Sequence, residues 1–201
     1  MNTELDNRIA RIHAAMGVVV QNDVSKFGIE VQDLPGKVRV SFGGGMSEVE
    51  LENAVNQPVS LLAHLPDHLR GWAKANHHPT SLIDQLLIDS LSFKLLRDLA
   101  DREKHGGWPR DGGYSNKYPS ISNISRAMRM RNQQAPVRMS LSFNAGGPTF
   151  GIDRGSSRVV IDADVIDSEG ASLGRLTELL ETAMTEFEQL FENLTQLPPK
   201  A

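Results

Sequence analysis

The chain has 201 residues, with 21 lysines and arginines against 25 aspartates and glutamates and no cysteine. This length suits a single domain that can bury a hydrophobic core without covalent cross-links. The lack of cysteine excludes disulfides, thiolate metal sites and a cysteine nucleophile. The sequence shows neither the apolar core of a signal peptide nor the run of about 20 apolar residues that crosses a membrane. We therefore expect a cytoplasmic protein with no membrane partner.

Charge is distributed unevenly along the chain. Residues 102–138 contain 8 basic and 2 acidic residues, whereas residues 162–201 contain 2 basic and 9 acidic residues. The basic centre and the acidic C-terminal region could attract each other, or the centre could face an anionic partner.

Hydrophobic periodicity predicts a mainly helical region over residues 1–105. Apolar residues at three- and four-residue steps predict a helix over residues 3–24. Alternation of apolar and polar residues from Lys37 to Phe42 predicts a half-buried strand.

Ser47 and Glu50 have the spacing of a capping box, which favours a short helix from Ser47 to about Asn56, although the pattern there also suits a strand. Pro58 and Pro66 are expected to divide the next segment into short helices, over residues 59–65 and 67–74.

A continuous apolar stripe predicts one long helix over residues 80–105, closed by Gly106 and Gly107. The stripe consists of Leu82, Ile83, Leu86, Leu87, Leu91, Leu95 and Leu99.

The C-terminal half is predicted to contain strands and a second long helix. Residues 106–136 are rich in Gly, Pro, Ser and Asn and predict an irregular basic connection. Residues 137–144 and 159–167 alternate and are expected to pair as an antiparallel hairpin within residues 137–167. Residues 172–197 predict an amphipathic helix.

Together these elements predict an α+β fold in one domain, residues 1–201. Two long amphipathic helices would contribute to a helical bundle, and a small antiparallel β-sheet of residues 137–167, with residues 37–42 as an optional further strand, would pack beside it.

The densest polar motif lies at the end of the predicted long helix. Asp98, Asp101 and His105 stand at i, i+3 and i+7, on the face opposite the leucines, and Lys104 precedes His105. A carboxylate one turn from an imidazole can orient it and raise its pKa, so these four residues are candidate catalytic residues. The alternative is structural, because ion pairs at i,i+4 and cations in the last turn stabilise an exposed helix.

The run Asp98-Leu-Ala-Asp101-Arg-Glu-Lys104-His105 resembles the D-x-x-[ND]-x-x-K-H motif of bacterial helical proteins that are similar to HEPN domains. The predicted order of elements agrees from about residue 55 to 197. The resemblance implies a metal-independent ribonuclease or RNA-binding effector in a stress or defence system. The Arg-x(4–6)-His dyad of active HEPN ribonucleases is absent, because Arg97 and Arg102 stand eight and three residues before His105.

Basic and aromatic residues around the predicted irregular connection form a candidate contact surface for RNA or a protein partner. Arginine and lysine bind phosphates, and aromatic rings stack on bases. The candidates are Arg102, Arg126, Arg129, Arg131, Tyr114 and Tyr118.

No metal site and no cofactor are predicted. His77 and His78 precede a proline in an ordinary loop sequence, and His64 and His68 are separated by Pro66, which disfavours helical geometry between them. Asp162, Asp164 and Asp167 could hold a cation, but carboxylates at alternate strand positions are usually solvated. The glycine runs match no phosphate-binding pattern.

Two functional hypotheses follow. The first is a non-catalytic interaction module that binds a protein partner or its own copy, for example as a homodimer. The second is the HEPN-like ribonuclease or RNA-binding effector, using Asp98, Asp101, Lys104 and His105.

Overall fold

The structure is a computed structural model that describes the backbone of residues 3–17, 28–34, 37–43, 47–107, 112–131, 139–144, 147–152 and 156–197. Side chains are described for residues 4–16, 47–107, 112–125 and 161–197. The helices are α1 (Thr3–Gly17), α2 (Glu48–Ala63), α3 (Leu65–Ala75), α4 (Ser81–Asp89), α5 (Leu91–His105) and α6 (Leu176–Gln196). The strands are β1 (Gly28–Leu34), β2 (Lys37–Gly43), β3 (Ser120–Arg131), β4 (Met139–Asn144), β5 (Gly147–Ile152), β6 (Ser156–Ile166) and β7 (Ser172–Arg175).

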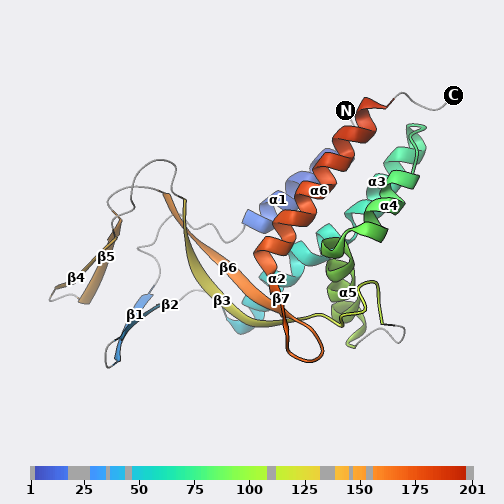
Figure 1. Ribbon diagram of the computed structural model, residues 1–201. Helices are drawn as coiled ribbons and strands as arrows, with labels where there is room; N and C mark the ends of the chain where they lie inside the picture. The colour runs from blue at the N-terminus through green and yellow to red at the C-terminus, as the bar shows by residue number, and fades with distance from the viewer. Residues whose placement is uncertain are drawn as a thin grey trace.

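The predicted α+β class is confirmed. The helices gather at one end of the molecule, and the long antiparallel ribbon of β3 and β6 leads away from them (Figure 1). The hairpins β1–β2 and β4–β5 lie at the far end of this ribbon (Figure 1). In the described part of the chain, no helix is both long and apolar enough to cross a membrane.

The first predicted helix is confirmed as α1 for its described part, and residues 18–24 lie outside the described residues. The capping box that opens α2 is also confirmed. The Ser47 amide donates to Glu50 Oε2 at 2.6 Å, and the Glu50 amide donates to Ser47 Oγ at 3.3 Å. The Ser47 amide and hydroxyl both donate to the Glu50 carboxylate, and these two hydrogen bonds hold the pKa of Glu50 below its usual value.

Pro58 does not divide the following segment, so that prediction was wrong. The helix α2 continues through Pro58 to Ala63. Val55, Val59 and Leu62 are buried against the core on either side of the proline, and this packing offsets the backbone hydrogen bond that the proline cannot make. Pro66, in contrast, stands in the first turn of α3, where a proline costs no hydrogen bond.

The predicted long helix over residues 80–105 is broken at Ser90, into α4 and α5. Ser90 is extended, with φ −74° and ψ 115°, and its hydroxyl accepts a hydrogen bond from the Phe93 amide as the N-cap of α5. The same hydroxyl donates to Glu186 on α6. The apolar stripe concealed this break because it continues across Ser90 without losing its helical spacing. Gly106 closes α5 with φ +67°, as predicted.

The segment 106–136 is not irregular throughout, because its residues 120–131 form β3. This strand pairs with β6 in the three-stranded antiparallel sheet β3–β6–β7. Residues 172–175, predicted as the start of the last helix, form β7 instead, and α6 begins at Leu176.

The predicted pairing of residues 137–144 with 159–167 is also wrong. The strand β4 pairs with β5, its neighbour across residues 145 and 146, and β6 pairs with β3. The short connection favours local pairing, and it makes β4–β5 a small hairpin inserted between the two strands of a larger one. The strand predicted over residues 37–42 is confirmed as β2, and its partner is β1.

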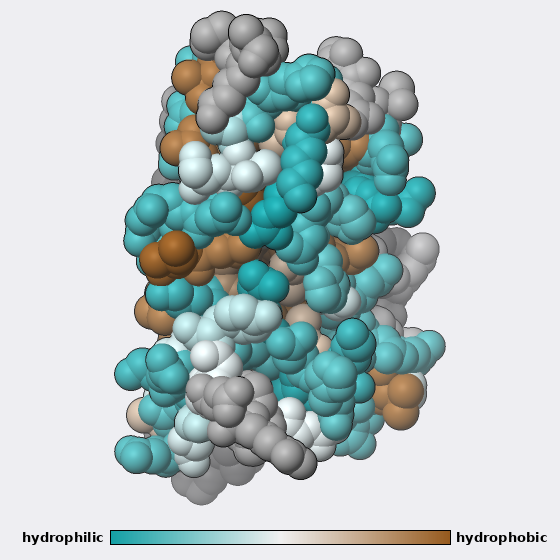
Figure 2. All heavy atoms as spheres, turned by 90° about the vertical axis from the view of Figure 1, so that its right-hand side faces the viewer, coloured by the Kyte–Doolittle hydropathy of each residue, from teal (hydrophilic) through white to brown (hydrophobic). Residues whose placement is uncertain are grey.

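The hydrophobic core lies between the helices and the base of the sheet. Helix α2 packs against α5, and α6 packs against both α5 and β6. The core includes Leu62, Phe93, Leu96, Ala163 and Phe187, each completely buried. On the face that Figure 2 shows, most side chains are hydrophilic and the apolar ones form smaller spots.

A buried carboxylate joins the sheet to α6. Asp162 on β6 is only 4% exposed, and it accepts hydrogen bonds from Arg175 Nε at 3.0 Å and from the Thr177 amide at 3.1 Å. Arg175 also pairs with Asp164. Asp162 therefore satisfies an amide at the start of α6 and neutralises the arginine that precedes the helix. Asp162 and Asp164 are thus both paired with Arg175 and stabilise the fold.

We expect Asp162→Ala to lower the free energy of unfolding by about 2–4 kcal/mol. The change removes a helix cap and a charged hydrogen bond at a buried position. Urea denaturation measures the effect. Glu192→Ala, at an exposed position of α6, is the control and should change stability by less than about 0.5 kcal/mol. Equal effects of the two substitutions would contradict the role assigned to Asp162.

Candidate functional site

Asp98, the first residue of the predicted motif, holds the loop after α5 through hydrogen bonds, and we call this arrangement the Asp98 latch. Asp98 is 2% exposed, although it lies on the face of α5 that the sequence assigns to solvent. Its carboxylate accepts hydrogen bonds from the Tyr114 amide at 2.7 Å, the Ser115 amide at 2.8 Å and the Ser115 hydroxyl at 2.5 Å. Three donors saturate the inward side of this carboxylate, so it holds the loop after α5 and is not available as a base.

The loop reaches Asp98 because two glycines allow a close backbone approach. Gly112 and Gly113 have φ of +82° and +65°, in the region that favours glycine. A Cβ atom on Gly113 would lie 2.3 Å from Asp98 Oδ1. A side chain at this position would therefore push the loop off the carboxylate.

The remaining motif residues do not join Asp98. Asp101 is half-buried, whereas Lys104 and His105 are exposed at the end of α5. Within the described ranges, no hydrogen bond or ion pair connects Asp101 with His105. The four predicted catalytic residues thus lie on one helix, but the structure does not bring their functional groups together around a reacting atom.

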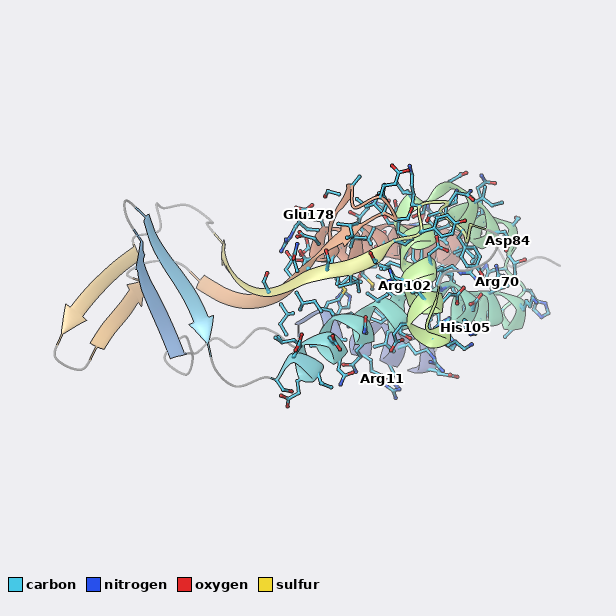
Figure 3. The ribbon with its side chains drawn as sticks, turned by 90° about the horizontal axis from the view of Figure 1, so that it is seen from below. Arg11, Arg70, Asp84, Arg102, His105 and Glu178 are labelled. Atoms are coloured by element: carbon cyan, nitrogen blue, oxygen red, sulfur yellow. The ribbon has the colours of Figure 1, made fainter. Side chains whose placement is uncertain are left out.

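Arg102 lies between the helix end and the sheet. Its guanidinium donates to the Pro119 carbonyl at 3.3 Å, just before β3 begins. Arg102 and Glu103 line an open groove of about 430 Å³, together with side chains of α2 and β3. Figure 3 shows Arg102 and His105 on α5.

The predicted aromatic contacts are used within the chain. The Arg97 guanidinium lies 4.2 Å from the centre of the Tyr114 ring and donates to its hydroxyl at 3.2 Å. This cation–π contact fixes the loop to α5 beside the Asp98 latch. Tyr118 is half-buried and has φ +51°. Tyr114 is 45% exposed despite its contact with Arg97.

The predicted arginines of the basic segment belong to a strand rather than a loop. Arg126, Arg129 and Arg131 lie on β3, where the pairing register sets Arg129 opposite Arg158 of β6. The side chains of these residues lie outside the described part of the structure.

The histidines form no metal centre. His78 stacks on Trp72 with ring centres 5.0 Å apart, His77 has φ +58°, and His13 bonds to Glu188 at 3.0 Å. Of the described residues, no group of three or more His, Cys, Asp or Glu side chains is placed to hold a metal ion.

Sequence reasoning identified Asp98 but missed its partners. Tyr114 and Ser115 follow it by 16 and 17 residues. No local signal links positions so far apart, since the contact forms only when the loop folds back on α5. The neighbouring glycines 112 and 113 were the one available sign of a close approach.

No protein-family model, curated protein or solved structure matches this chain. The resemblance to HEPN-like proteins remains a prediction.

We expect Asp98→Ala to destabilise the protein by about 3 kcal/mol, because it leaves buried amide donors without their charged acceptor. Hydrogen exchange at the Tyr114 and Ser115 amides should become faster, and urea denaturation gives the change in stability. Asp101→Ala, one turn along the same helix, should change stability by less than about 1 kcal/mol.

Gly113→Ala provides a second check on this latch. Gly113→Ala should lower the free energy of unfolding of the wild-type protein by more than it lowers that of Asp98→Ala. The reason is that Asp98→Ala removes the carboxylate oxygen with which the new Cβ collides. Additive effects of the two substitutions would show that the loop does not press on Asp98.

Proposed function

We propose that this protein is a non-catalytic interaction module that associates with its own copy through a β arm. The β arm consists of β1, β2, β4, β5 and the outer part of the β3–β6 ribbon. The proposal is carried by one observation: β1–β2 and β4–β5 are separate two-stranded sheets at the end of the molecule away from the helices (Figure 1). A two-stranded hairpin is only marginally stable in water, so both hairpins are favoured by a further layer of protein.

The pairing register supports an apolar contact by these hairpins. Residues directly opposite each other in an antiparallel pair share one face, and alternate pairs share the same face. In β4–β5 the pairs on one face are apolar and those on the other are small or polar. The apolar pairs are Met139–Ile152, Leu141–Phe150 and Phe143–Pro148, and the others are Ser140–Gly151, Ser142–Thr149 and Asn144–Gly147.

The hairpin β1–β2 has the same division. Ile29 is opposite Phe42 and Val31 is opposite Val40, whereas Glu30 is opposite Ser41. An identical surface on a second copy matches such a face in size and polarity, and two-fold pairing of identical surfaces is the commonest mode of protein association.

The helical body supports the non-catalytic part of the proposal. The Asp98 carboxylate is committed to the loop, and Asp101 has no hydrogen bond or ion pair with His105 in the described structure. The face of the helical end in Figure 2 is largely hydrophilic, so the β arm is the better candidate for an extended apolar contact.

We expect the wild-type protein to have a mass above that of one chain, measured by light scattering over a range of concentrations. Leu141→Glu should shift it to the single-chain mass, because it places a charge on the apolar face of β4–β5. Ser142→Glu, on the opposite face of the same strand, is the matched control and should leave the mass unchanged. A wild-type protein that remains a single chain at all concentrations, or a control that dissociates equally, contradicts self-association.

A HEPN-like ribonuclease is the alternative function, favoured by the exposed Lys104 and His105 on α5, the helix whose Arg102 lines a groove. On our proposal, the purified protein cleaves a short single-stranded RNA no faster than His105→Ala does. Because His105 is exposed, this substitution should leave the melting temperature unchanged. RNA cleavage that is lost in His105→Ala would replace the interaction module with the ribonuclease.

A further inference from the structure

A small basic cavity lies between α1 and the junction of α2 with α3. It measures about 140 Å³, and Ile12, Leu61 and Leu65 form its apolar wall, with Ile12 and Leu65 buried. Polar side chains line the rest of the cavity. Arg8 and Arg11 come from α1. Ser60 comes from α2, His68 from α3, and His64 is the residue between these two helices.

The cationic groups of this cavity are only partly neutralised. Arg8 bonds to Glu4 at 3.0 Å, but the Glu4 side chain is 75% exposed, so solvent weakens this pair. Arg11 is exposed at the edge of the helical body (Figure 3) and has no hydrogen bond or ion pair with another described residue.

The surroundings of His68 also carry more positive charge than the nearby carboxylates neutralise. Burial, and then repulsion by Arg8, lower the pKa of His68 below its usual value, and His64 acts in the same direction. Glu4 and Asp67 oppose the shift but do not cancel it. An anion placed between these groups would relieve the repulsion and reverse the shift.

We propose that this cavity binds a phosphate group, either free or on a small phosphate ester, between Arg8 and Arg11 on one side and His64 and His68 on the other. Guanidinium and imidazole groups are suited to a tetrahedral oxyanion, and the Ser60 hydroxyl can donate a further hydrogen bond. The volume admits such a group, whereas a drug-sized ligand occupies pockets of about 300–1,000 Å³. This site is independent of the β arm and of self-association.

Binding should strengthen as the pH falls. The groups that face His68 are Arg8, Glu4, Asp67 and His64. For an anion whose own charge is constant between pH 8 and pH 6, protonation of His68 adds a positive charge at the cavity and strengthens binding. Since a bound anion raises the histidine pKa, linkage requires tighter binding below that pKa.

The experiment is a titration of the full-length protein with inorganic phosphate, followed by NMR and calorimetry at constant ionic strength. We expect saturable binding with a Kd in the millimolar range. Arg11→Ala should weaken it about tenfold, because a charged hydrogen bond is lost. Lys74→Ala, which removes the same charge from an exposed position of α3 outside the cavity, should leave the affinity unchanged.

Further arms of the experiment identify the ligand and its partner groups. Sulfate keeps its charge from pH 6 to pH 8, so a change in its affinity over this range reports on the protein and not on the anion. Sulfate should bind more tightly at pH 6. Saturating sulfate should raise the pKa of His68, and His64→Gln should weaken binding without affecting the melting temperature. Glycerol phosphate that binds more tightly than inorganic phosphate identifies an ester as the ligand, and the reverse identifies the free ion.

Three results would each overturn the site. They are no saturable binding up to about 20 mM phosphate, an equal loss of affinity in Lys74→Ala and Arg11→Ala, and a His68 pKa that does not move when sulfate saturates.

Discussion

The hydrogen bonds of the Asp98 carboxylate determine where the second half of the structure begins. This side chain on α5 holds Tyr114 and Ser115, and the chain enters β3 only five residues later, at Ser120. From there β3 pairs with β6 in the ribbon that leads to β4–β5. A buried carboxylate can hold a loop in this way because leaving it or the loop amides unpaired would be costly.

A second buried carboxylate performs the matching task at the other side of the sheet. Asp162 fixes Arg175 and the first turn of α6 to β6, so the last helix is tied to the strand that pairs with β3. The two aspartates thus connect the helices with the sheet from both ends. In both cases the acidic group stabilises the fold, and the surface chemistry lies elsewhere, in the β arm and in the basic cavity beside α1.

Several features could be predicted from local sequence because their causes are local. The capping box of Ser47 and Glu50 needs only residues three positions apart, and Gly106 closes α5 through its own backbone freedom. Other features could not be predicted because distant residues decide them. Ser90 breaks a continuous apolar stripe where its hydroxyl meets both Phe93 and Glu186. Pro58 remains inside α2 because the core surrounds its neighbours.

For the fold and the candidate site alike, some features follow from local sequence and others depend on distant residues. The sequence by itself determined the α+β class, the positions of α1 and β2, the end of α5 and most of α6, since hydrophobic periodicity reflects which face of each element meets the core. It also singled out Asp98. Only the tertiary structure decided that Asp98 binds a loop and that Arg97 covers Tyr114. It alone brought Arg8 and Arg11 opposite His64 and His68. The physical reason is that periodicity records burial, whereas the partner of a polar group depends on how distant segments meet.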